Sequence, residues 1–155
     1  MNDDISPVDA LHLREAIRAS RAAVAAGAMP FGAVLLTADG RVLTARNAPA
    51  VPGDRTGHAE TNAVRDALAA WGAEALRGST MYASGEPCPM CAAAMLWAGV
   101  RRVVFAGGSG VMAAHGIDTL RPGCAELMGQ RAVAVVGPVL EAEAAAVYGE
   151  WASRP

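Results

Sequence analysis

Four residues of the sequence combine into a pattern that could bind a metal ion. His58-Ala59-Glu60 precedes Cys88-Pro89-Met90-Cys91 by about thirty residues. Cysteine thiolates and histidine imidazoles are ligands that zinc favours. Each motif stands at the start of a predicted helix, where exposed N–H groups and the helix dipole stabilise thiolates. If the two helices lie side by side, His58, Cys88 and Cys91 meet, and we expect one Zn²⁺ ion per chain there.

The number of ligands separates a catalytic zinc site from a structural one. A structural site uses four protein ligands, whereas a catalytic site keeps one position open for water. The sequence offers three good ligands, and zinc would lower the pKa of a coordinated water from about 15.7 towards ~7. Glu60 is placed to accept the water proton and pass it on. An amidine-like carbon in a heteroaromatic ring is a suitable target, from which ammonia would leave.

Two other interpretations of these residues remain open at this point. Cys-x-x-Cys alone could be a redox pair or half of a structural zinc site. Cys124 could supply a fourth ligand, which would make the protein a zinc-stabilised module without activity, although a lone cysteine is more often a small buried apolar residue. The order of the two motifs, each opening a helix, favours hydrolysis.

The composition restricts the class of protein. The chain has 155 residues, of which 53% are hydrophobic and 18% charged, as expected for one globular domain over residues 1–155. The net charge of -2 argues against strong electrostatic binding of nucleic acid. Three cysteines fit a disulfide framework poorly. The acidic N-terminus lacks the apolar core of a signal peptide, and no apolar run reaches the ~20 residues of a membrane span, so we expect a cytoplasmic protein.

The hydrophobic pattern predicts the elements that must position these residues. Ser6 and Pro7 open a first helix that ends near Gly27, and Ala38-Asp39-Gly40 is a hairpin turn. Strands alternate with helices after this hairpin, which predicts an α/β fold with a five-stranded mixed sheet covered by helices on both faces. The expected strands are 31–37, 41–46, 80–84, 102–106 and 132–136, and the later helices are 58–71, 88–98 and 139–151. Residues 107–123 are rich in glycine and receive no assignment.

The two motifs together resemble the signature of the cytidine deaminase superfamily. His-x-Glu followed by Pro-Cys-x-x-Cys is typical of zinc-dependent nucleobase deaminases. The resemblance extends over nearly the whole chain. It implies a three-layer α/β/α sandwich, one zinc per chain, and a homodimer or larger homo-oligomer.

Further segments resemble two branches of that superfamily, the guanine deaminases and the bacterial tRNA adenosine deaminases. These segments are Pro30 to Val34, Asn47, Asp54 to Glu60, and Glu86 to Cys91. The resemblance implies that Asn47 hydrogen-bonds the substrate base, that Phe31 flanks it, and that Ala59 belongs to the substrate-contacting run. An amide suits the first role because it offers both a donor and an acceptor.

Two features favour a small ring over tRNA as the substrate. Trp97 stands where guanine deaminases carry a tryptophan that reaches the neighbouring subunit's pocket, whereas the tRNA enzymes typically carry histidine. The chain is also acidic and ends in a segment with Glu141, Glu143 and Glu150. Without a basic tail, a phosphate backbone would be difficult to hold.

The resemblance to guanine deaminases is incomplete after Cys91. Gly116-Ile117-Asp118 loosely resembles their Gly-Phe-Asp-Asp segment, whose acidic residues help to hold the purine, so Asp118 is a candidate substrate contact. Thr119 replaces the second aspartate, and the C-terminal segment also differs. Guanine is favoured, while tRNA adenosine, cytosine, a nucleoside or a triazine remain open as substrates.

Overall fold

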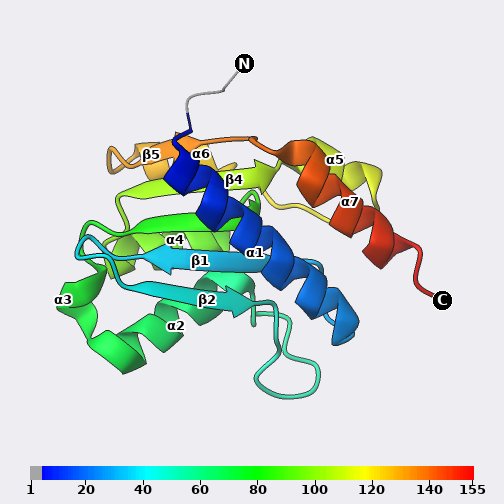
Figure 1. Ribbon diagram of the computed structural model, residues 1–155, viewed down its shortest axis with the longest axis horizontal. Helices are drawn as coiled ribbons and strands as arrows, with labels where there is room; N and C mark the ends of the chain where they lie inside the picture. Colours follow the sequence, from blue (N-terminus) through cyan, green and yellow to red (C-terminus); the bar gives the residue numbers. More distant parts are fainter. Residues whose placement is uncertain (1–4) are drawn as a thin grey trace.

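A mixed sheet of five strands forms the centre of the computed structural model, which describes residues 5–155 (Figure 1). The strand order is β2-β1-β3-β4-β5. β1 pairs antiparallel with both β2 and β3, whereas β3, β4 and β5 run parallel. The predicted mixed α/β sheet is therefore confirmed. The strands are β1 (Gly32–Leu36), β2 (Val42–Arg46), β3 (Thr80–Gly85), β4 (Arg102–Gly107) and β5 (Ala134–Val136).

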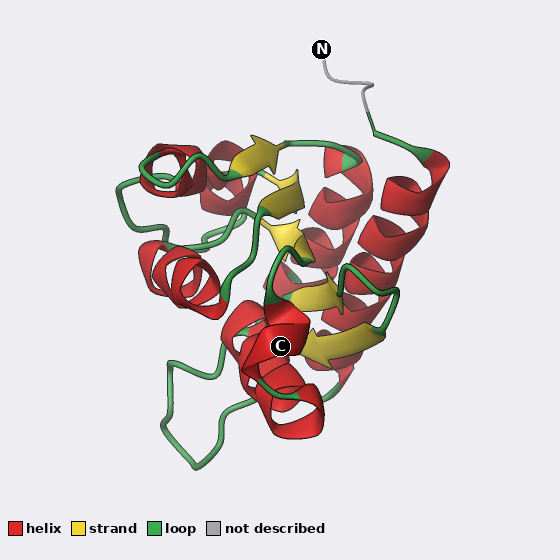
Figure 2. Cartoon of the chain, turned by 90° about the vertical axis from the view of Figure 1, so that its left-hand side faces the viewer, coloured by secondary structure: helices red, strands yellow, loops and turns green. Residues whose placement is uncertain are grey.

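Helices cover both faces of this sheet, which lies between them in the view of Figure 2. One apolar cluster joins α2, α4 and α6 to one face, and a second joins α1, α5 and α7 to the other. None of the helices described in residues 5–155 is long and apolar enough to cross a membrane. The helices are α1 (Pro7–Ala25), α2 (Ala59–Trp71), α3 (Ala73–Leu76), α4 (Pro89–Ala98), α5 (Ser109–Ala114), α6 (Cys124–Gly129) and α7 (Glu141–Ala152).

The first helix begins where the sequence predicts it. The Ser6 hydroxyl accepts a hydrogen bond from the Asp9 N–H, and the Asp9 carboxylate accepts one from the Ser6 N–H, which completes a capping box. Pro7 occupies the first turn, where no N–H donor is needed. The C-cap is Ala26 rather than Gly27; the glycine follows it with a positive φ of 79°, which a residue without a side chain adopts easily.

Three short helices escaped the sequence prediction, and two predicted elements begin two residues later than expected. α3, α5 and α6 have four to six residues, too few to establish a helical period. The strand expected from residue 132 begins at Ala134, because Ala132 has a left-handed backbone with φ 54°. The helix expected from residue 139 begins at Glu141 for the same reason, since Leu140 has φ 56°.

A buried carboxylate connects α1 to the sheet. Arg102 donates to both oxygens of Asp9 at 2.7 and 2.9 Å, and the Tyr82 hydroxyl donates to one of them at 2.8 Å. The hydrogen bonds from Arg102 hold the pKa of Asp9 well below its usual range. Asp9 therefore remains ionised in the folded protein at pH values where it is protonated in the unfolded chain.

We expect Asp9→Asn to lower the free energy of unfolding by about 3 kcal/mol at pH 7, because Arg102 loses its charged partner. A carboxyl whose pKa is depressed on folding stabilises the protein fully above its unfolded pKa of about 4. This effect begins to decrease below that value and is lost as the pH falls through the lower folded-state pKa. Urea unfolding at pH 7 and pH 3.5 should show the difference from wild type shrinking on acidification. Asp66→Asn, on the exposed side of α2, is the control. A difference of equal size at both pH values would contradict this account.

Candidate metal centre and active site

The three predicted metal ligands stand at the N-termini of α2 and α4. His58 is the N-cap residue of α2, Cys88 is the N-cap residue of α4, and Cys91 lies in the first turn of α4. Both N-cap residues have an extended backbone, and neither side chain caps its own helix. The two helices pack against each other. The imidazole and thiols are therefore free to face a common point.

The distances between these ligand atoms fit a zinc ion. His58 Nδ1 lies 3.6 Å from Cys88 Sγ and 3.5 Å from Cys91 Sγ, and all three atoms lie within 4.8 Å of one another. A tetrahedral zinc with Zn–S near 2.3 Å and Zn–N near 2.05 Å separates nitrogen and sulfur ligands by about 3.6 Å. The donor set and its spacing therefore match one zinc ion.

Cys124, the possible fourth ligand, is not part of this cluster. It is fully buried at the start of α6 and packs among the apolar residues of the core. Burial raises the pKa of its thiol to about 12. Among residues 5–155, the cluster therefore offers three protein ligands, which leaves a coordination position for water.

The environment of the cluster favours the ionised form of its first thiol. A hydrogen bond from Cys91, together with one from His58, lowers the pKa of Cys88 to about 4. The hydrogen bond to Cys88 in turn raises the pKa of His58. Cys88 is therefore a thiolate at neutral pH, which is the form that binds metal.

Glu60 lies beside the three ligands, in the first turn of α2. Only 5% of its surface is exposed, yet it lines the same cavity as His58 and Cys88. Burial raises the pKa of this carboxyl to about 7. A group with a pKa near the working pH can both accept and return a proton, as acid–base catalysis requires.

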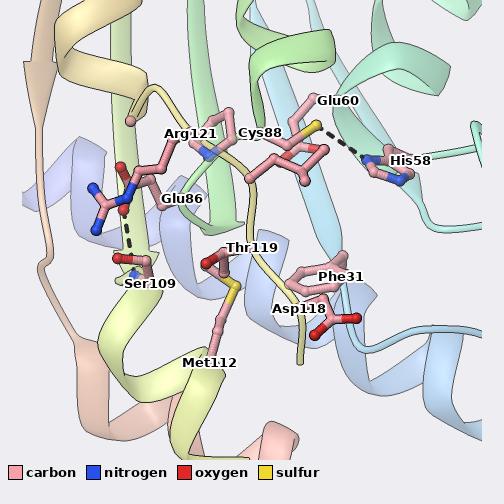
Figure 3. Close-up of a pocket in the computed structure, with 13 residues that line it drawn as sticks. Phe31, His58, Glu60, Glu86, Cys88, Ser109, Met112, Asp118, Thr119 and Arg121 are labelled. Atoms are coloured by element: carbon pink, nitrogen blue, oxygen red, sulfur yellow. Dashed lines mark hydrogen bonds between the residues drawn. The ribbon is translucent and has the colours of Figure 1, made fainter. Parts of the chain in front are cut away.

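His58 and Cys88, together with Glu60, line one end of a cavity (Figure 3). Phe31, which precedes β1, forms part of the wall, and the segment between α5 and α6 contributes Asp118, Thr119 and Arg121. The cavity thus brings two zinc-type ligands and Glu60 together with an aromatic side chain and several polar groups.

Comparison with known families decides the identity of this arrangement. Residues 7–107 match the family model of the cytidine and deoxycytidylate deaminase zinc-binding region. The chain belongs to this deaminase family. The matched residues include His58, Glu60, Cys88 and Cys91, and so contain the cluster described above.

Relatives of this deaminase chain differ in their substrates. It is 38% identical over 102 residues to a probable cytosine deaminase of Schizosaccharomyces pombe, covering 66% of this chain and 62% of that protein. It is 37% identical over 97 residues to the tRNA-specific adenosine deaminase of Bacillus subtilis, covering 63% and 60%. The chain thus matches less than two-thirds of the length of these curated relatives. The crystal structure of a guanine deaminase from Nitrosomonas europaea superposes with a TM-score of 0.81 at 26% identity, covering 99% of this chain and 89% of that one.

Tyr148 of α7 packs against the cavity wall from the face of the deaminase sheet opposite to α2 and α4. Its hydroxyl donates to the Ser84 carbonyl at 2.9 Å, and its ring lies 5.9 Å from that of Phe31. A Cβ atom on Gly85 would come within 2.8 Å of this hydroxyl, and one on Gly107 within 2.3 Å. The last residues of β3 and β4, Gly85 and Gly107, must therefore be glycines, because Tyr148 occupies the space that a side chain would need.

Only some of the predicted substrate contacts of the deaminase line the cavity. Phe31 and Asp118 line the cavity, whereas Asn47, Ala59 and Trp97 do not. The Asn47 N–H donates to the Phe31 carbonyl at 2.9 Å, which ties it to the wall through the backbone. Ala59 is fully buried in α2. Trp97 is 81% exposed at the far end of α4, where the Arg131 guanidinium lies 5.6 Å from the centre of its ring.

Several cavity residues were missed from the sequence. Arg121 and Leu120 lie in the segment that received no assignment, and Met112 and Ser109 belong to the short helix α5. Glu86 was noted only as part of a resemblance, although a charged residue directly before the zinc-ligand turn was a signal that could have identified it.

Proposed function

We propose that this protein is a zinc-dependent hydrolase acting on cyclic amidines, which deaminates a free nucleobase or related heterocycle, guanine being favoured. Residues 1–155 would act as one deaminase domain. The observation that carries this proposal is the convergence of three zinc-type ligands and the buried Glu60 at one end of a cavity that has a phenyl wall. Relatives with deaminase names support the same reaction class.

The residues present divide the reaction between them. When bound, zinc would supply a Lewis acid that lowers the pKa of coordinated water. Glu60 accepts the water proton and delivers it to a ring nitrogen, while the water oxygen bonds to the amino-bearing ring carbon. Glu60 then takes the proton of the new hydroxyl group and passes it to the amino group, so that the C–N bond breaks, ammonia leaves and a carbonyl group remains. Phe31 packs against the face of the ring, and Asp118 accepts hydrogen bonds from N–H groups at its edge.

Three further residues are proposed to bind substrate by other routes. The backbone of Asn47 is hydrogen-bonded to that of Phe31, and its side-chain amide is proposed to turn towards the edge of the base. Ala59 is proposed to shape the site between His58 and Glu60. The exposed Trp97 is proposed to reach the pocket of a second copy in a homodimer.

The charge distribution supports a small substrate rather than a nucleic acid. The net charge is -2, and two arginines of α1 are paired with carboxylates of α7. Arg14 lies 3.0 Å from Glu143, and Arg21 lies 3.0 Å from Glu150. These guanidinium groups are engaged within the chain, which reduces the positive surface available to phosphates.

The test is ammonia release by the zinc-loaded protein from guanine, cytosine, adenine and a tRNA anticodon stem-loop. We expect guanine to be the preferred substrate and the stem-loop to be unreactive. A reaction with the stem-loop alone, lost as salt rises, would favour the tRNA function suggested by the Bacillus relative. Preference for cytosine would move the substrate to that of the Schizosaccharomyces relative.

A further inference from the structure

Glu86 occupies a fixed position between the sheet and the zinc-ligand turn. It directly follows β3 and precedes Pro87-Cys88. Its N–H donates to the carbonyl of Gly107, the last residue of β4, at 2.7 Å. The backbone of Glu86 is therefore held by the sheet, and its side chain projects from this anchor into the cavity (Figure 3).

The Glu86 carboxylate accepts hydrogen bonds from the first residues of two separate helices. Oε2 accepts from the Ser109 N–H of α5 at 3.3 Å, and Oε1 accepts from the Cys124 N–H of α6 at 3.2 Å. The first N–H groups of a helix have no partner within it, and a negative charge is favourable there. One side chain thus serves two helix N-termini.

Both helices depend on an outside acceptor because of their own N-cap residues. Gly108 precedes α5 and Gly123 precedes α6, and neither can provide a side-chain cap. A Cβ atom on Gly123 would lie only 3.1 Å from Glu86 Oε1. Because Gly123 has no side chain, α6 needs an acceptor from elsewhere in the chain, and the Glu86 carboxylate has room to approach.

Between these two helices lies the segment that forms the substrate-facing wall. Asp118, Thr119 and Arg121 belong to it and line the cavity. The segment lies after residues 7–107, the part that matches the family model. The two hydrogen bonds to Glu86, from Ser109 before the segment and from Cys124 after it, connect both of its ends to the residue that precedes Pro87-Cys88.

We propose that Glu86 is a positioning residue that holds segment 115–123 against the zinc-ligand turn and thereby sets the binding of the base. This inference rests on the proposed deaminase function. Glu86→Gln keeps the shape of the side chain but places an NH₂ group opposite one of the two N–H donors. Glu86→Asp keeps the charge but is one carbon too short to reach both.

The decisive measurements are hydrogen–deuterium exchange of residues 115–123 and steady-state kinetics with guanine, both on zinc-loaded protein. For both variants we expect exchange in this segment and the KM to rise about tenfold, with kcat within about threefold of wild type and zinc content unchanged. Glu74→Gln removes a glutamate charge from an exposed position on α3, outside the cavity, and should match wild type.

Unchanged exchange in 115–123 would overturn the proposal, as would a wild-type result for Glu86→Asp, since charge alone would then suffice. A fall in kcat at constant KM, or loss of zinc, would also overturn it by moving the role of Glu86 to the chemical step or the metal. If the wild-type protein released no ammonia from guanine, the proposed substrate would fail separately, and the exchange measurement would still decide whether Glu86 holds the segment.

Discussion

Glu60→Gln is expected to lower kcat for ammonia release by about a thousandfold. The amide has nearly the shape of the carboxyl but can neither accept the water proton nor return it to the ring. Because Glu60 is buried and its pKa is raised to about 7, removal of its charge should not weaken the fold. Activity, thermal unfolding and bound zinc are to be measured on the same preparation.

The control for this experiment is Glu74→Gln, at an exposed position on α3 outside the cavity. It should retain wild-type activity. A Glu60→Gln variant that binds zinc and keeps more than about a tenth of the activity would assign the proton transfer to another group. Loss of zinc together with activity would instead show that Glu60 helps to hold the metal.

Cys91→Ala is expected to weaken zinc binding by more than about a hundredfold and to leave no measurable deamination. The thiol is fully buried, and it is one of the three side chains that form the ligand cluster among residues 5–155. Metal content after dialysis and ammonia release with zinc restored are the two measurements. A stoichiometric zinc content in the variant would contradict the ligand assignment.

The matched control is Cys124→Ala, which removes a thiol of equal burial from outside the cluster. We expect it to retain zinc and activity, with a small loss of stability from the lost sulfur. Visible spectra of the cobalt-substituted wild type should indicate three protein ligands and change when an exogenous ligand is added. Loss of metal from Cys124→Ala, with spectra typical of four protein ligands, would support a structural zinc module.

The metal cluster could be predicted because its signals are local. His58 and Cys88 are N-cap residues, and each is marked by a break in the hydrophobic pattern just before a helix. The sheet could be predicted for a similar reason, since β-strands and long helices repeat their apolar residues at fixed spacing. α5 and α6 have no such repeat, and their glycine N-cap residues give no capping signal.

Contacts between residues far apart in the sequence could not be predicted from the pattern of residue types. The Glu86 carboxylate meets Cys124 across 38 residues, and the Tyr148 hydroxyl meets Ser84 across 64. Trp97 is exposed, and Asn47 lies outside the cavity lining. Both properties likewise depend on how α4 and β2 are placed in space. Such properties follow from tertiary packing, which residue spacing does not encode.

The packing of Tyr148 beneath the cavity limits how this protein can be divided or recombined. A chain cut after residue 107 would keep the ligands and Glu60 but lose the ring that fills the space over Gly85 and Gly107. Phe31 would lose its neighbour, and the Ser84 carbonyl would lose its donor. In a chimera that takes its C-terminal helix from a relative, the residue at position 148 must therefore still fit against Gly85 and Gly107. Otherwise the packing behind the Phe31 wall of the cavity will be lost.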